Sequence, residues 1–246
     1  MSAPAARDAM APAASTVGQG PHAGRRILAT GAPLGSARLA LVMLHGRGGA
    51  PEDMIGLAEH LAVPDVAVLA PEAAGRSWWP ASFLAPLAAN EPGLASGLSA
   101  VEGLLDELQR AGVEPERTVL AGFSQGACLA LEAAARLARP FHAVAALSGG
   151  LLGTGEADGA AHEGLYGHAD KRFDYCGRLD GVPVLLGCHA RDLHIPLTRV
   201  RRSAEVLEGM GAAVETMILP GAGHGVVAEE AAWLRGRLNG APARPA

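Results

Sequence analysis

The chain has 246 residues, of which 49% are apolar and 18% charged, and its formal net charge is −5. This length fits one large α/β domain or two small ones, and the acidic balance argues against a nucleic-acid-binding protein, for which a clustered basic face is expected. No apolar run approaches the roughly 18 residues that span a bilayer, so stable membrane insertion is not expected. The three cysteines form no Cys-x-x-Cys pair, which indicates a reducing, cytoplasmic setting.

The two ends of the chain differ in composition from the rest. Residues 1–24 are rich in Ala, Pro, Ser and Gly and have no apolar periodicity, which predicts a disordered leader. They also lack the basic start and apolar stretch of a secretory signal. Residues 240–246 are expected to form a loose tail. No linker divides the chain between these ends, so a single domain is predicted over 25–239.

Short apolar runs alternate with longer helical patterns along this domain. Strands are predicted at 25–30, 37–44, 66–70, 118–121, 143–147, 182–188 and 213–219, and helices at 51–62, about 92–111, and 127–138. This alternation predicts a mostly parallel sheet with helices on both faces. Sites in such sheets form at the carboxyl ends of strands. The stretch 151–180 has no clear periodicity and is expected to be a loop that borders the site.

The most informative motif is Gly122-Phe123-Ser124-Gln125-Gly126, which lies between a predicted strand and a predicted helix. A serine at such a turn takes a strained backbone position and exposes its hydroxyl above the sheet, as a nucleophile does. A side chain at either flanking position would clash in so tight a turn. Ser124 is therefore predicted to be a nucleophile.

A serine nucleophile needs a base to accept its proton and an acid to orient that base. In one large group of serine enzymes their order along the chain is Ser, acid, His. His224 follows the strand predicted at 213–219, and Asp192 follows the strand at 182–188. Each candidate thus follows its own strand in the expected order.

Other side chains compete for these two roles. His189 and His194 lie in the loop of Asp192 itself, whereas His162 and His168 lie in the irregular stretch and His45 belongs to another motif. For the acid, the alternatives are Asp180, Asp174 and Asp170. We predict His224 and Asp192.

The chemistry also requires two backbone N–H groups that bind the oxyanion of a tetrahedral intermediate. The residue after the nucleophile, Gln125, supplies one at a helix N-terminus, where the helix dipole favours an anion. The loop His45-Gly46-Arg47-Gly48-Gly49 follows an early strand, and the N–H of Arg47 is predicted to be the other. This loop lacks the Gly-Lys-Ser/Thr ending of a phosphate-binding loop.

Further residues on the same edge of the sheet are candidates for contact with substrate. Trp78 and Trp79 follow the strand at 66–70, and Trp79 is the stronger candidate, although either could simply pack in the core. Gly46 is a second candidate. Cys128, four residues after Ser124, is expected to be a buried structural thiol. The histidines and acids show no zinc-ligand spacing, so no metal or cofactor is expected.

Six motifs together resemble the phospholipase/carboxylesterase family of the α/β-hydrolase fold, which includes acyl-protein thioesterases and small bacterial carboxylesterases. They are His45-Gly46-Arg47-Gly48-Gly49, Trp78-Trp79-Pro80, Gly122-Phe123-Ser124-Gln125-Gly126, Leu147-Ser148-Gly149-Gly150, Asp192-Leu193-His194-Ile195-Pro196 and Gly223-His224. The resemblance covers roughly 39–238. It departs at Leu193, where the family often has proline, at Trp79 in place of tyrosine, and in the longer stretch 153–178.

The resemblance implies a cofactor-free serine hydrolase that cleaves small esters or thioesters through an acyl-enzyme. It assigns triad roles to Ser124, Asp192 and His224 and oxyanion roles to the amides of Arg47 and Gln125. Two alternatives stay open: an acyltransferase or perhydrolase with the same triad, and a binding module without catalysis. The sequence leaves the oligomeric state open, a homodimer being one option.

Overall fold

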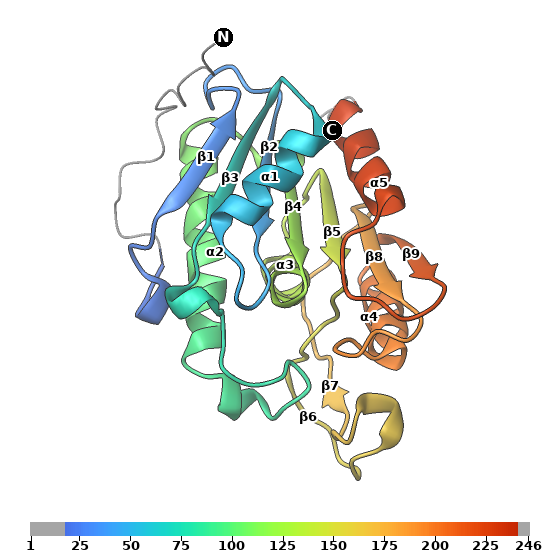
Figure 1. The fold of residues 1–246 in the computed structure, drawn as a ribbon. Coiled ribbons are helices and arrows are strands. Elements are labelled where there is room, and N and C mark those ends of the chain that lie inside the picture. Colours follow the sequence, from blue (N-terminus) through green and yellow to red (C-terminus); the bar gives the residue numbers. More distant parts are fainter. Residues whose placement is uncertain (1–17, 241–246) are drawn as a thin grey trace.

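The computed structural model describes residues 18–240, and its centre is a seven-stranded sheet in the order β1-β3-β2-β4-β5-β8-β9 (Figure 1). The strands are β1 (Ile27–Gly31), β2 (Leu39–Leu44), β3 (Val66–Pro71), β4 (Thr118–Phe123), β5 (Ala143–Leu147), β8 (Pro183–His189) and β9 (Ala213–Leu219). Neighbouring strands run parallel except β1, which pairs antiparallel with β3. The prediction of a mostly parallel α/β sheet is confirmed.

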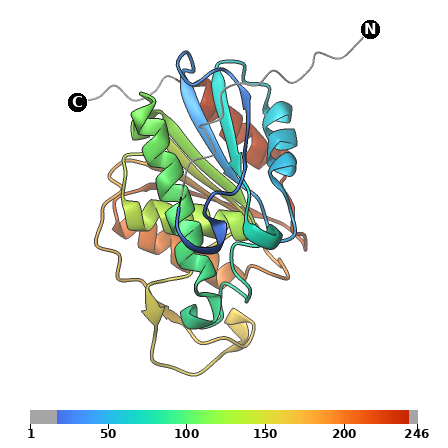
Figure 2. The same ribbon diagram turned by 90° about the vertical axis from the view of Figure 1, so that its left-hand side faces the viewer.

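Five α-helices cover this sheet on both faces. Helices α1 (Pro51–Leu61) and α5 (Ala228–Asn239) lie on one face, and α2 (Gly93–Arg110), α3 (Gln125–Leu137) and α4 (Leu197–Gly209) lie on the other (Figures 1 and 2). Among the described residues, no helix is long and apolar enough to cross a membrane.

The alternation of side chains along each strand explains why helices cover both faces of the sheet. Side chains of successive strand residues point to opposite faces of a sheet. Leu41 of β2 therefore packs into the core beneath α1 and α5, and its neighbours Ala40 and Val42 pack into the core beneath α2, α3 and α4. All six residues of β2 are buried, which is why the sequence reads as a continuous apolar run.

Local signals in the sequence place the helix boundaries. Helix α1 starts at Pro51, where the carboxylate of Asp53 accepts the N–H of Ala50 at 2.8 Å, and Glu52 adds a second acidic group in the first turn. Helix α2 buries the apolar stripe that the sequence predicts, including Leu94, Leu104 and Leu108.

The N-terminal segment is more structured than the predicted leader over 1–24. Residues 1–17 lie outside the described part of the chain, but Gly20–His22 form a turn of 3₁₀ helix (η1). His22 is buried, its Nε2 donates to the carbonyl of Trp78 at 2.9 Å, and its Nδ1 accepts the N–H of Ala74 at 2.9 Å. Burial lowers the pKa of His22, which keeps it neutral in this bridging position. Of the expected tail, Gly240 is described and residues 241–246 are not.

The irregular stretch after β5 forms an excursion, which we define as residues 151–180. It contains a two-stranded hairpin of β6 (Gly155–Glu156) and β7 (Lys171–Arg172) and lies beyond the carboxyl edge of the main sheet (Figures 1 and 2). The hydroxyl of Tyr166 donates a hydrogen bond to the carbonyl of Asp192. The excursion therefore touches the loop that carries the predicted acid, whereas none of its residues lines the cavity at Ser124.

A buried carboxylate on α5 generates a prediction about stability. Glu230 accepts the N–H of Val227 at 2.9 Å through Oε2, whereas Oε1 has no hydrogen-bond partner in the described protein. Burial raises the pKa of Glu230 to about 7, far above its value in an unfolded chain. The free energy of unfolding therefore falls as pH rises from 4.5 to about 7, because the unfolded carboxyl loses its proton while the folded one keeps it, and the full penalty is present above this range.

We expect Glu230→Gln to raise the free energy of unfolding at pH 8 by up to about 3 kcal/mol, because it removes a poorly solvated charge. The gain should shrink toward pH 5, where Glu230 is already protonated. Urea denaturation at both pH values measures the difference. The exposed neighbour Glu229→Gln is the control and should change little. An equal gain at pH 5 and pH 8 would contradict the burial argument.

Candidate active site

The turn between β4 and α3 holds Ser124 in a backbone conformation that few residues other than glycine adopt. Ser124 has φ 54° and ψ −116°, and such strain persists only where the surrounding structure fixes it. Its N–H donates to the carbonyl of Leu147 at 2.9 Å, and its own carbonyl accepts the N–H of Cys128 at 3.0 Å. The neighbouring strand and the first turn of α3 therefore hold the serine from both sides.

The two glycines of the motif permit this turn because backbone atoms approach them closely. A Cβ on Gly126 would lie 2.1 Å from the carbonyl oxygen of Leu44, and a Cβ on Gly122 would lie 2.2 Å from the carbonyl oxygen of Gly126. Both distances are far below van der Waals contact. The requirement for glycine on each side of Ser124, inferred from the sequence, thus has a direct steric cause.

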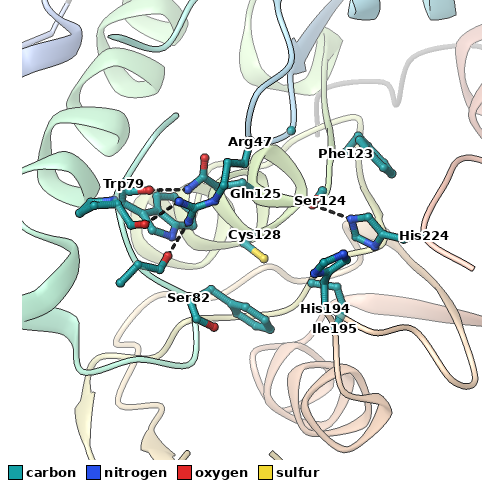
Figure 3. A pocket seen from close by; sticks show the side chains of 14 residues that line it. Arg47, Trp79, Ser82, Phe123, Ser124, Gln125, Cys128, His194, Ile195 and His224 are labelled. Atoms are coloured by element: carbon teal, nitrogen blue, oxygen red, sulfur yellow. Dashed lines mark hydrogen bonds between the residues drawn. The ribbon is translucent and has the colours of Figure 1, made fainter. Parts of the chain in front are cut away.

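The structure brings Ser124, His224 and Asp192 together in one chain of hydrogen bonds (Figure 3 shows the Ser124–His224 link). His224 Nε2 lies 2.8 Å from Ser124 Oγ, and His224 Nδ1 lies 2.8 Å from Asp192 Oδ2. An ionised carboxylate only accepts hydrogen bonds, so Nδ1 carries the proton and Nε2 is free to accept the serine hydroxyl. This is the protonation state that a general base requires.

Asp192 is held ionised although it is 1% exposed. Burial by itself would raise the pKa of this carboxyl, but the hydrogen bond from His224 and the N–H groups of His194 and Ile195 outweigh burial and lower it. The two N–H groups donate to Oδ1 at 2.8 and 3.1 Å, which leaves Oδ2 for the imidazole. A buried, fixed negative charge therefore faces His224 Nδ1.

The other candidate acids, and His45 and His189 among the other histidines, have partners of their own. The three alternative acids each pair with an arginine: Asp170 with Arg199, Asp174 with Arg172 and Asp180 with Arg178. His45 binds its own loop, since its Nδ1 donates to the carbonyl of Gly46 and its Nε2 accepts the N–H of Ala73. His189 packs beneath Gly223, where an added Cβ would lie 2.8 Å from its ring.

The two N–H groups predicted to bind an oxyanion are unused within the protein. Neither the N–H of Arg47 nor that of Gln125 donates to another group in the described residues. Gly46 brings the Arg47 loop against the serine, because a Cβ on Gly46 would lie 3.3 Å from Ser124 Cβ and 3.1 Å from the Phe123 ring. Gln125 is the first residue of α3, where the helix dipole attracts negative charge.

The side chain of Gln125 has a second function, which the sequence did not reveal. Its Nε2 donates to the carbonyl of Trp79 at 2.8 Å, and its Oε1 accepts the N–H of Trp78 at 2.8 Å. Arg47 holds the same segment from the other side by donating to the carbonyls of Pro80 and Ala81, each at 2.5 Å. Both residues predicted to supply oxyanion N–H groups thus position the tryptophan segment through their side chains.

A cavity of about 430 Å³ opens onto Ser124 (Figure 3). It is lined by Gly46, Arg47, Trp79, Pro80, Ala81, Ser82, Phe83, Phe123, Ser124, Gln125, Cys128, His194, Ile195 and His224. Trp79 is 2% exposed and still lines the cavity, whereas Trp78 is fully buried and donates through Nε1 to the carbonyl of His45. Trp79 therefore packs in the core and also forms part of the cavity wall, whereas Trp78 is a core residue only.

Cys128 also lines this cavity as a buried thiol. Burial raises the pKa of Cys128 to about 12, and its sulfur accepts the N–H of Gly150 at 3.4 Å. At neutral pH it is a protonated, weakly polar group and not a thiolate nucleophile. The expectation of a structural thiol fits this environment.

Glu132 is an anchor that reasoning from the sequence missed. It is fully buried on α3, and its Oε1 accepts the N–H groups of Leu152 and Gly153 and the hydroxyl of Tyr175. Its Oε2 accepts Arg136 Nε at 2.7 Å. These bonds fasten the excursion to α3, the helix that directly follows Ser124. The sequence signal that could have revealed this role is a glutamate on an otherwise apolar helix face.

Comparison with known proteins supplies the family. The model of the phospholipase/carboxylesterase family matches residues 27–238. The chain belongs to this family. The crystal structure of a phospholipase/carboxylesterase from Dyadobacter fermentans is 36% identical, with a TM-score of 0.77 over 87% of this chain and 96% of that chain. The crystal structure of esterase PE8 is 27% identical, with a TM-score of 0.65 and the same coverage.

A curated relative matches over a shorter region. Acyl-protein thioesterase 1 of Gibberella zeae is 32% identical over 123 residues, which cover 48% of this chain and 46% of the relative. The chain thus aligns with about half the length of that protein. Family and solved structures confirm the resemblance that the sequence motifs indicate.

The contact of Gly46 with Ser124 can be tested by adding one methyl group. We expect Gly46→Ala to lower kcat/KM for ester hydrolysis by about tenfold or more, because the new Cβ displaces the Arg47 N–H relative to Ser124. Hydrolysis of a short p-nitrophenyl ester measures the loss. Gly56→Ala in α1, where an added Cβ meets nothing within 4 Å, is the matched control. Equal activity in both variants would show that this loop position does not matter.

Proposed function

We propose that this protein hydrolyses carboxylic esters or thioesters through an acyl-enzyme on Ser124. The single observation that carries the proposal is the continuous chain of hydrogen bonds from Ser124 Oγ through His224 to Asp192 Oδ2, each link 2.8 Å long. Membership of the phospholipase/carboxylesterase family supports the same reaction class.

In the first step, Ser124 Oγ attacks the acyl carbonyl carbon while His224 Nε2 takes the hydroxyl proton. The carbonyl oxygen becomes an oxyanion and accepts the N–H groups of Arg47 and Gln125, a donor of this kind being worth about 2.7–4 kcal/mol. The intermediate then collapses, the C–O or C–S bond breaks, and the leaving alcohol or thiol takes the proton from His224.

In the second step, water replaces the alcohol. His224 Nε2 takes a proton from the water, whose oxygen attacks the acyl-enzyme carbonyl, and the same N–H groups hold the second oxyanion. Collapse releases the acid and returns the proton to Ser124 Oγ. Asp192 stays ionised through both steps, keeps Nδ1 protonated and stabilises the imidazolium.

The reducing, cytoplasmic setting is also a proposal. Cys128, Cys176 and Cys188 are all free thiols in the described structure, as proteins of reducing compartments have. The substrate is proposed to be a small ester or thioester that enters the cavity of about 430 Å³. Cleavage of thioesters is proposed because a relative of this chain is an acyl-protein thioesterase.

The two rival functions of this site differ in the fate of the acyl group. An acyltransferase or perhydrolase would pass it to an alcohol or a peroxide, and a binding module would never form it. The comparisons with esterases favour neither. Product analysis with competing alcohol separates transfer from hydrolysis.

We expect Ser124→Ala to fold normally and to lose at least about 10⁴-fold in kcat for a short p-nitrophenyl ester, because no other hydroxyl replaces the nucleophile. Reaction with a fluorophosphonate probe is the second readout. The wild type should be labelled on Ser124 and the variant should not. Retained turnover or labelling in the variant would refute the proposed function.

The identity of the acid is tested by two matched substitutions. Asp192→Asn should lower kcat by about 10³–10⁴-fold, because an amide no longer fixes the required tautomer of His224. Asp180→Asn should change kcat little, since Asp180 is exposed and pairs only with Arg178. Steady-state hydrolysis of one ester compares them, and the opposite ranking would assign the acid to another residue.

A further inference from the structure

His224 stands on a loop with little backbone support. In the described structure, residues 222–226 make no hydrogen bond to other backbone groups, whereas the residues before them are tied to the acid loop by Arg191 N–H to Gly221 O at 3.1 Å. Glycines precede and follow His224, so the local backbone has unusual freedom. The position of the imidazole therefore depends on contacts of the ring itself.

Two hydrogen bonds hold the two nitrogens of this ring, but they leave the ring free to rotate about the line between these nitrogens. Nδ1 faces Asp192 and Nε2 faces Ser124, so both bonds lie near one line through the ring. Rotation of the ring about that line would keep both distances and turn the plane of the ring. Some other contact must hold the plane of the ring.

Two aromatic rings supply this contact, one on each side of His224. The Phe123 ring lies with its centroid 5.1 Å away at 44°, and the His194 ring lies 4.7 Å away at 65°, in an edge-on arrangement. Figure 3 shows His224 between them. Both separations fall within the 4.5–7 Å range at which aromatic pairs attract. We call Phe123 and His194 the ring clamp.

The backbones of both clamp residues are held in place, although the His194 side chain is exposed. Phe123 ends β4 and precedes the strained Ser124. The N–H of His194 donates to Asp192 Oδ1 at 2.8 Å, so the carboxylate that orients His224 also sets the position of the clamp residue. The imidazole of His194 makes no hydrogen bond to the described protein and lines the cavity.

We propose that His194 is a positioning residue whose ring, opposite Phe123, holds the plane of the His224 imidazole between Ser124 and Asp192. The inference rests on the proposed serine-hydrolase function. It does not give His194 a proton to transfer or a substrate group to bind. Its edge-on ring acts through His224 alone.

A positioning role for His194 predicts a characteristic effect on the rates of acylation and deacylation. His224 is the base in acylation and in deacylation, so loss of the clamp must slow both steps by a similar factor. A contact between His194 and the leaving group would slow acylation only, since the leaving group has departed before water attacks. The ratio of the two rates therefore separates positioning of His224 from recognition of the leaving group.

The experiment compares His194→Ala, His194→Phe and Leu193→Ala with the wild type. Leu193 is the adjacent residue in the same loop and is 80% exposed, so its truncation controls for disturbance of the loop. kcat/KM for a p-nitrophenyl ester reports acylation, and decay of the isolated acyl-enzyme reports deacylation. Thermal unfolding verifies that each variant is folded.

We expect His194→Ala to slow acylation and deacylation alike by about tenfold, with the loss independent of the leaving group. His194→Phe restores a ring and should stay within about twofold of wild type, as should Leu193→Ala. Loss confined to acylation, no loss in His194→Ala, or failure of Phe to restore the rate would each overturn the proposal.

The proposed function is tested separately in the same samples. Fluorophosphonate labelling of wild-type Ser124 shows whether the serine is a reactive nucleophile at all. An unreactive wild type refutes the serine-hydrolase function, whereas a reactive wild type with unchanged His194 variants refutes only the clamp.

Discussion

The close contact between the start of α3 and the end of β2 is the constraint on which the rest of the site depends. Gly126 packs closely against the carbonyl of Leu44, and Ser124, two residues earlier, has a positive φ of 54° in a conformation that costs of order 1–3 kcal/mol. Because β4 lies between β2 and β5 in the middle of the sheet, neighbouring strands hold the turn on both sides. The same turn fixes the direction of the serine hydroxyl and places the N–H of Gln125 at the helix N-terminus. This turn therefore sets the positions of the Ser124 hydroxyl and the Gln125 N–H, which are predicted to be the nucleophile and an oxyanion donor.

Neutral histidines form a supporting layer behind this turn. Burial lowers the pKa of His45 and of His22, so each ring has one nitrogen that donates and one that accepts. Both hold the tryptophan segment: His22 binds the carbonyl of Trp78, and the backbone of His45 receives the Trp78 indole N–H. Protonation of either ring would remove an acceptor in a buried place, where a lost hydrogen bond is costly. The side chain of Gln125 completes the layer, so the loop of Arg47 and the tryptophan segment are positioned as one unit.

Much of this arrangement could be predicted from the sequence, and the missing parts share a physical cause. Apolar runs revealed the strands, and residues just after them revealed Ser124, Asp192 and His224, because strand ends of a parallel sheet converge on one edge. Glu132 was missed because its partners are backbone groups of a segment without periodicity. The structure that part of the predicted leader adopts around His22 was missed, because it depends on contacts with a loop that is distant in the sequence and leaves no local sequence pattern. The roles assigned to the three site residues remain predictions, although their hydrogen bonds agree with them.

The anchoring of the excursion has a consequence for how this enzyme family can diversify. At one end the excursion is tied to α3 through Glu132, and at its tip Tyr166 is tied to the backbone of Asp192. A segment free to vary in length would be the natural place to alter substrate range. Here, however, the attachments end on α3, which directly follows Ser124, and on the backbone of Asp192. Exchange of this segment for that of a relative would thus disturb the surroundings of both residues, so that changes in the excursion and in the reaction rate would evolve together.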